Sequence, residues 1–115
     1  MLGLDMEYRK GVLFIRLSGE LNHNTASRLE NEVSKLIAEV GIKYIVFNIE
    51  NLTLIDMAGI DVLLKNNDIV CHNQGKAFVC GIKHELVKHR IENSRLLKYM
   101  VETSNELGAL NIINI

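Results

Sequence analysis

Proline is absent from this 115-residue chain, and its eight glycines are scattered. Without proline-rich, glycine-rich or other low-complexity stretches, the chain contains no segment that is typical of a linker, and it shows no internal repeat. A chain of this length can bury a core but is too short to divide into two domains. We therefore expect one domain that covers residues 1–115.

Neither sign of charge is in excess, because 13 basic and 14 acidic residues give a net charge of -1. A basic surface for nucleic acid or an anionic membrane is therefore not expected. No apolar run approaches the roughly 20 residues that span a bilayer, and residues 1–9 lack the layout of a signal peptide. These absences favour a cytoplasmic protein whose partners are proteins or small molecules.

Motifs of catalysis and metal binding are also missing. The chain has no phosphate-binding glycine loop, nucleophile elbow or zinc-binding His-Glu-x-x-His helix. Its only cysteines, Cys71 and Cys80, do not share a metal-ligand spacing with the four histidines. We expect both cysteines to be small buried thiols, and we expect no catalytic residue, cofactor or metal ion.

Strand-forming residues gather in short apolar runs. Residues 12–17 form one run, and the alternation around Met6 and Tyr8 before a turn at residues 10–11 predicts an opening hairpin. The nearly continuous apolar run at residues 42–49 is typical of a central strand that is covered on both faces. A further strand is predicted at residues 77–80, and residues 52–55 are expected to connect the central strand to the helix that follows it.

Elsewhere the apolar residues recur at helical spacing. Amphipathic helices are predicted at 24–40, where Gly41 is the expected terminator, and from Asp56 to about residue 71. Shorter helix-like stretches follow at 84–91, 96–101 and 104–110. Alternating strands and helices indicate an α/β domain with a mixed, mostly parallel sheet, an N-terminal antiparallel hairpin and about four helices. The long helices are expected to bury Ala26, Leu29, Val33, Leu36, Ile37, Val40, Ile60, Leu63, Leu64, Val70 and Cys71.

Two polar stretches stand where a predicted strand gives way to a helix. They are Gly-Glu-Leu-Asn-His-Asn-Thr at 19–25 and Leu-Ile-Asp-Met-Ala-Gly at 54–59. In α/β folds such junctions form the functional rim of the sheet. The chain resembles the anti-sigma factor antagonist family of STAS domains in these stretches and over nearly its whole length. The strand at 12–17, the helix at 25–40, Val-Phe-Asn-Ile at 46–49 and the segment at 93–100 carry the rest of the resemblance.

The resemblance implies a STAS-like fold and a partner switch. In that family the unmodified antagonist binds an anti-sigma factor of the serine kinase type and frees a sigma factor. Phosphorylation in an Asp-Ser-x-Gly or Asp-Thr-x-Gly motif breaks the complex, because a phosphate adds about -1.5 to -2 charges that are costly to trap in an interface. Here Asp56 and Gly59 match, but Met57 occupies the phosphoacceptor position and Ala58 follows it. Asn22 also departs from the aspartate that is common in the family.

An antagonist-like regulator that is not phosphorylated at the usual site is therefore expected. Met57 suits a permanently active antagonist, a decoy, a degenerate or engineered form, or simple gap filling. Asp56 is also interpretable as a helix cap, and residues 22–25 as a capped turn. The hydroxyls of Ser18 and Thr53 are alternative phosphate acceptors or ordinary hydrogen-bonding groups. The residues expected to bind the partner are Asn22, His23, Asn24, Thr25, Asp56, Met57, Ala58, Gly59 and Ile60.

Two other functions remain open from the sequence. A STAS domain without a phosphoacceptor could be a scaffold that self-associates as a weak homo-oligomer. The helix starts at the rim could instead hold an anion, as in a sensor of a small molecule or nucleotide. An enzyme is not expected, because Asp56 and His23 have no identifiable third partner.

Overall fold

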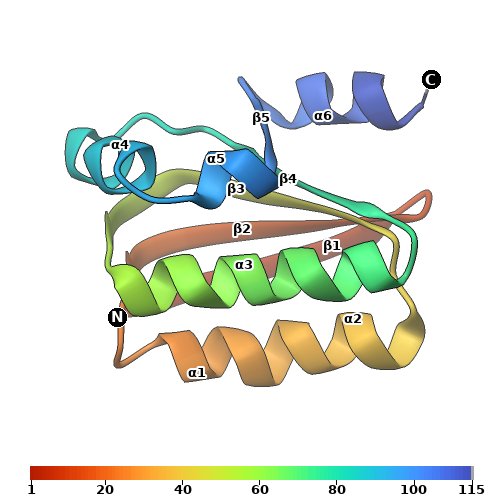
Figure 1. Ribbon diagram of the computed structural model, residues 1–115, viewed down its shortest axis with the longest axis horizontal. Helices are drawn as coiled ribbons and strands as arrows, with labels where there is room; N and C mark the ends of the chain where they lie inside the picture. Colours follow the sequence, from red (N-terminus) through yellow and green to blue (C-terminus); the bar gives the residue numbers. More distant parts are fainter. Residues whose placement is uncertain (115) are drawn as a thin grey trace.

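The computed structural model describes residues 1–114, in which five strands form one sheet in the order β1-β2-β3-β4-β5 (Figure 1). β1 and β2 are antiparallel, and every other neighbouring pair is parallel. The prediction of a mixed, mostly parallel sheet entered by a hairpin is confirmed. The strands are β1 (Leu2–Arg9), β2 (Val12–Leu21), β3 (Tyr44–Ile55), β4 (Lys76–Cys80) and β5 (Val101–Thr103).

The first helical run spans residues 26–40 and contains a π-helical segment between two α-helical ones. If this run is counted as one helix, residues 1–114 contain five helical segments, and four of these have at least eight residues. This agrees with the prediction of about four helices. Its left-handed terminator is Gly41, with φ of 76°, as predicted. The helices are α1 (Ala26–Leu29), η1 (Glu30–Ser34), α2 (Lys35–Val40), α3 (Met57–His72), α4 (Glu85–Glu92), α5 (Leu96–Tyr99) and α6 (Glu106–Ile113).

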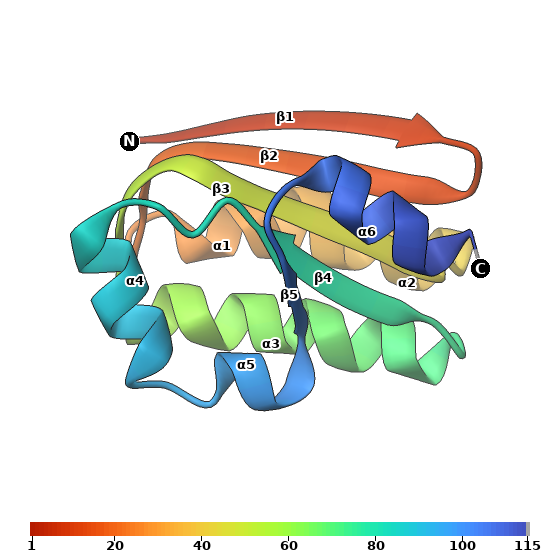
Figure 2. The same cartoon turned by 90° about the horizontal axis from the view of Figure 1, so that it is seen from above.

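The sheet is covered on both faces. The run from α1 to α2 and α3 lie on one face, and α6 lies on the other (Figures 1 and 2). The main core lies beneath α3, where Ile15, Phe47 and Val79 stand in register on three neighbouring strands and are fully buried. A smaller cluster that includes Phe14, Val46 and Ala109 lies under α6. β3 is therefore a central strand buried from both sides, as its apolar run predicted.

An acidic side chain anchors α6 to the sheet. Glu106 accepts hydrogen bonds from Arg16 Nε at 2.8 Å and Arg16 Nη2 at 2.9 Å, and from Asn48 Nδ2 at 2.9 Å. This two-pronged contact with Arg16 holds the pKa of the Glu106 carboxyl below its ordinary value, against the opposing effect of burial. The charge pair thus fixes the first turn of α6 on β2.

Some predicted boundaries were wrong. The first helix begins at Ala26 rather than residue 24, because Thr25 occupies its N-cap position. β3 continues through Ile55, because Leu52, Leu54 and Ile55 pair with the end of β2 across shifts in register, so residues 52–55 are strand rather than a connection. Val101 was expected in a helix but begins β5, which pairs with β4. The last helix starts at Glu106 rather than residue 104, since Asn105 caps it by accepting a bond from Gly108 N at 2.9 Å.

Two residues expected in the core are exposed. Val40 is the last residue of its helix and is 62% exposed. Cys71 follows the buried Val70 and is turned from it by about 100° around α3, which brings its thiol to the surface. The buried polar contact between Ser34 Oγ and Asn66 Oδ1, at 2.6 Å, joins η1 to α3 and was not predicted. Within residues 1–114, no helix has the length and apolar content needed to cross a membrane.

Candidate protein-binding site

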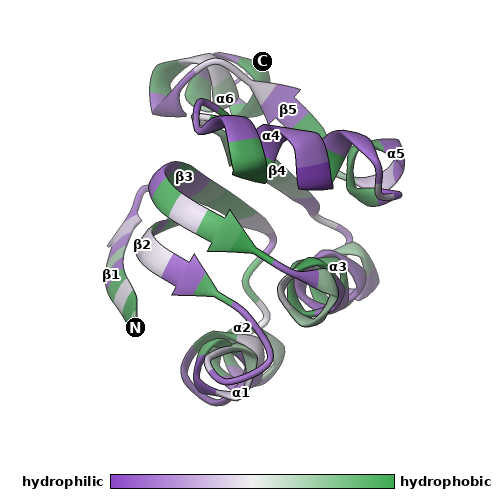
Figure 3. Cartoon of the chain, turned by 90° about the vertical axis from the view of Figure 1, so that its left-hand side faces the viewer, coloured by the Kyte–Doolittle hydropathy of each residue, from purple (hydrophilic) through white to green (hydrophobic). Residues whose placement is uncertain are grey.

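Two loop and helix-start segments meet at the carboxyl ends of β2 and β3. Leu21 and Ile55 are opposite each other in these parallel strands, and Asp56 N donates a hydrogen bond to the Leu21 carbonyl at 3.2 Å. The segments that follow, residues 22–25 and 56–60, therefore lie side by side where the chain enters α1 and α3 (Figure 3). The structure thus brings together all nine predicted contact residues, and we call residues 22–25 and 56–60 the rim.

Asp56 joins the two halves of the rim. Its Oδ1 accepts a hydrogen bond from Gly59 N at 3.0 Å, which caps α3, and its Oδ2 accepts one from His23 N at 3.0 Å. The ring atom His23 Nδ1 lies 3.3 Å from the same Oδ2. The predicted helix cap is confirmed, while the bond to His23 was not predicted. One carboxylate therefore fixes the position of residue 23 relative to the start of α3.

The pKa of Asp56 is lowered. Burial alone would raise it, but the amide bonds from Gly59 and His23, together with the His23 ring, stabilise the ionised carboxylate and outweigh burial. A group with a lowered pKa in the folded state contributes stability above its unfolded pKa, about 3.9 for aspartate, and loses it as the pH falls through the folded value. The capping contribution of Asp56 should therefore persist at neutral pH and vanish in acid.

Asp56→Ala should lower the free energy of unfolding by about 1 kcal/mol at pH 7, because two rim amides lose their acceptor. The difference from the native chain should shrink as the pH falls below the unfolded pKa of about 3.9, and should vanish once the pH is below the lowered folded pKa, where the native carboxylate is protonated. Urea unfolding at a series of pH values measures this. The control is Asp61→Ala, an exposed position of the same helix. A deficit that stays constant down to pH 2 would contradict the assigned role.

The segment at 22–25 is a closed polar turn. Asn22 N donates to Thr25 Oγ1 at 2.9 Å, Asn24 N donates to Asn22 Oδ1 at 2.9 Å, and the Thr25 hydroxyl donates to the Glu20 carbonyl at 2.9 Å. Thr25 occupies the N-cap position of α1 without forming a side-chain cap bond. The side chains of Asn22 and Thr25 are thus used to shape the turn, while His23 and Asn24 are exposed.

The start of α3 presents one large apolar side chain to solvent. Met57 is the first residue of the helix and is 56% exposed, and Ala58 is half-buried. Gly59 and Ile60 are buried beneath them. An added Cβ at Gly59 would lie 2.6 Å from the Leu21 carbonyl oxygen, so glycine is needed for the close approach of β2 to α3. Met57 and Ala58 therefore form the accessible part of this segment.

The alternative phosphate acceptors lie in strands β2 and β3 rather than at the start of α3. The Thr53 hydroxyl donates to the Gly19 carbonyl at 3.1 Å, which is the ordinary hydrogen-bonding use of a strand threonine. Ser18 is an exposed residue of β2. Among the described residues, no group of three or more His, Cys, Asp or Glu side chains is placed to hold a metal ion.

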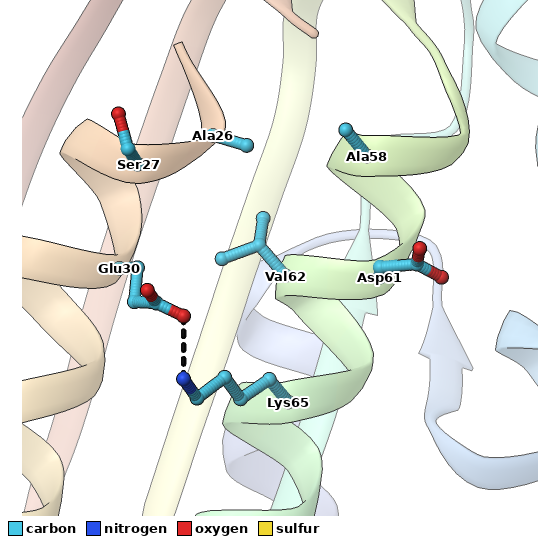
Figure 4. A pocket seen from close by; sticks show the side chains of 7 residues that line it. All are labelled: Ala26, Ser27, Glu30, Ala58, Asp61, Val62 and Lys65. Carbon is cyan, nitrogen blue, oxygen red and sulfur yellow. Dashed lines mark hydrogen bonds and ion pairs between the residues drawn. The ribbon is translucent and has the colours of Figure 1, made fainter. Parts of the chain in front are cut away.

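A shallow hollow adjoins the rim between the first helical run and α3 (Figure 4). Its volume is about 330 Å³, and a salt bridge between Lys65 and Glu30 crosses it. The small side chains of Ala26 and Ala58 keep its upper end open. We did not predict this hollow, although small residues at the starts of both helices were a usable signal. Its lining residues are Ala26, Ser27, Glu30, Ala58, Asp61, Val62 and Lys65.

Comparison with known proteins identifies the family. The family model described as STAS domain matches residues 3–110. The chain belongs to the STAS domain family. Over 115 residues this STAS domain is 31% identical to the anti-sigma F factor antagonist of Paenibacillus polymyxa, covering 99% of this chain and 97% of the relative. The fold class and the family predicted from the sequence are thus confirmed.

Two solved structures share the fold. One is an anti-sigma factor antagonist from Mycobacterium paratuberculosis, with a TM-score of 0.87, 18% identity, and coverage of 100% of this chain and 96% of that one. The other is the anti-sigma factor antagonist SpoIIAA in its unphosphorylated form, with a TM-score of 0.75, 18% identity, and coverage of 97% and 98%. At these identities the two structures support the architecture of this STAS domain alone.

Proposed function

We propose that this STAS domain is a cytoplasmic anti-sigma factor antagonist. It binds an anti-sigma factor of the serine kinase type through the rim and thereby releases a sigma factor. The full-length relative from Paenibacillus polymyxa, an anti-sigma F factor antagonist, supports this role. The domain acts by binding and not by catalysis.

The exposed Met57 supports a second part of the proposal, that this antagonist is not switched off by phosphorylation. It stands directly after the capping Asp56, at the first position of α3, where the family motif has serine or threonine. A thioether has no hydroxyl to phosphorylate, so the usual off switch is absent. Its flexible, polarisable side chain is suited to an adaptable protein contact. We therefore propose that the antagonist stays competent to bind its partner.

The electrostatics of the rim explain how the switch would act if a hydroxyl were restored. The Asp56 carboxylate lies one residue before position 57 and is ionised at neutral pH, since its pKa is lowered. A phosphate at position 57 would add about -1.5 to -2 charges beside it. Such a concentration of negative charge is costly to desolvate in an interface. The partner would therefore leave the phosphorylated form.

The decisive experiment compares the native chain with Met57→Ser in a titration against candidate anti-sigma kinases. Both should bind without ATP. With ATP, the native complex should persist, while Met57→Ser should become phosphorylated and lose more than about tenfold in affinity, equivalent to about 1.4 kcal/mol.

Met57→Leu is the matched control, because it keeps an apolar side chain without a hydroxyl and should remain bound in the presence of ATP. The proposal fails if the native chain binds none of the kinases. Release of the native chain by ATP would contradict the role assigned to Met57.

A further inference from the structure

β1 forms an unusually open edge of the sheet. It pairs with β2 over all eight of its residues without a register shift, and with no other strand in residues 1–114 (Figures 2 and 3). Edge strands are commonly protected by being short, bulged or covered, or by carrying charged side chains. β1 carries Asp5, Glu7 and Arg9, but it is long and regular, so the backbone on its outer side offers a template for another strand.

The hydrogen bonds show which backbone groups face outward. Met1 is bonded to β2, since its carbonyl accepts from Glu20 N at 3.0 Å. In an antiparallel pair the bonded residues alternate, so the odd-numbered residues of β1 turn to β2 and the even-numbered ones turn outward. The Arg28 guanidinium covers the outward carbonyl of Leu2. The outward groups of residues 4, 6 and 8 meet no such partner within residues 1–114.

The side chains of β1 are complementary to a second copy of the same strand. In an antiparallel pair centred on Glu7, Asp5 lies opposite Arg9 of the other copy, twice by symmetry. The two Glu7 side chains meet at the centre, where each is paired with its own Arg16 at 3.0 Å and Arg9 at 3.7 Å. A pairing centred on Met6 is less favourable. It would place Asp5 opposite Glu7, two like charges, and it would need a hydrogen bond to the Leu2 carbonyl, which Arg28 already occupies.

The apolar face of the same strand is also exposed. Met6 is 38% exposed and Tyr8 is 60% exposed, and the Glu7-centred pairing places them opposite each other. Methionine sulfur and an aromatic ring attract each other, and cross-strand aromatic pairs stabilise sheets. Tyr8 and the exposed Val40 line one hollow of about 440 Å³ beside the strand. A second copy would cover this apolar surface.

We propose that two copies of this chain pair through β1, antiparallel about a two-fold axis at Glu7, into one continuous sheet. The proposal does not depend on the proposed function. The rim lies at the end of β2, beyond Gly19, which is opposite Leu2, whereas the pairing is centred nearer the hairpin turn. The two rims therefore remain free at opposite ends of the dimer. Such a dimer could hold two partner molecules at once.

The first test is sedimentation equilibrium of the native chain between about 10 µM and 1 mM, the range suited to a small interface. The apparent mass should rise from 13.0 kDa toward twice that value. Asp5→Lys should abolish the rise, because lysine then faces Arg9. Adding Arg9→Asp should restore it, which an effect on folding could not do. A native chain that stays monomeric, or a double variant that does not recover, overturns the proposal.

The second test fixes the register by oxidative cross-linking in a Cys71→Ser background, since Cys71 is exposed and Cys80 is buried. Opposed residues at the centre of such a pair have Cα atoms about 4.5 Å apart, within disulfide range. Glu7→Cys should cross-link to its copy in high yield, and Tyr8→Cys should not. Absence of the Glu7→Cys product, or equal cross-linking of Tyr8→Cys, overturns the pairing. Partner binding by the same variants, assayed separately, reports on the proposed function alone.

Discussion

Gly59→Ala is expected to lower the free energy of unfolding by about 1–3 kcal/mol and to weaken anti-sigma binding as well. The added methyl group would lie 2.6 Å from the Leu21 carbonyl oxygen and 2.7 Å from Ile55 Cγ1. Both are buried at the ends of neighbouring strands, so relief requires α3 to move away from β2. That movement would stretch the Asp56 bonds that hold the two halves of the rim together. Urea unfolding and the kinase titration measure the two effects.

Gly108→Ala is the matched control, because Gly108 occupies the same position in α6. Its amide donates to the capping Asn105 Oδ1 at 2.9 Å, as that of Gly59 does to Asp56, but an added Cβ would meet Thr103 Cβ at 3.3 Å. Since alanine favours a helix over glycine by about 1 kcal/mol, this change should alter stability by less than about 1 kcal/mol. Equal losses from both variants would contradict a steric cause at Gly59.

Phe47→Ala should have the largest effect on stability, a loss of about 3–5 kcal/mol. Phe47 is fully buried in β3, the central strand of the sheet, between Ile15 and Val79 on the adjacent strands. Truncation leaves a cavity that the surrounding sheet and α3 cannot fill. Thermal and urea unfolding measure the loss.

Phe47→Leu keeps most of the buried volume at this position and should cost clearly less than the alanine variant. If the two variants were equally destabilised, the loss would not come from the cavity. If neither were destabilised, the central position of β3 in the core would be wrong.

Local sequence patterns were sufficient to predict the order of the main strands and helices. The apolar run at 42–49 and the helical spacing at 26–37 reflect burial that each element achieves against the sheet, so a single stretch of sequence reports it. Residues 52–55 differ, because the exposed Thr53 and Leu54 make this stretch look like a connection. Its pairing with β2, across a register shift, is decided by contacts that are distant in the chain. The three-residue β5 likewise depends on β4.

The rim was predictable in part for the same reason. The cap at Asp56 is a local motif of four residues, and the adjacency of residues 22–25 and 56–60 follows from parallel strands. The bond between Asp56 and His23 joins residues 33 positions apart, and the pair of Arg16 with Glu106 joins residues 90 positions apart. No short pattern encodes such partners. The contact of Ser34 in the π-helical segment with Asn66 likewise joins residues 32 positions apart.

The double use of the Asp56 carboxylate has a consequence for the thermodynamics of docking. Because it holds both the His23 amide and the first turn of α3, the rim is already ordered before a partner arrives. In the proposed docking at the rim, association should immobilise few additional backbone degrees of freedom, and we expect the exposed Met57 side chain to supply most of the adaptation. The heat capacity change on binding should therefore reflect burial of a preorganised surface, without the larger contribution that folding of a loop would add.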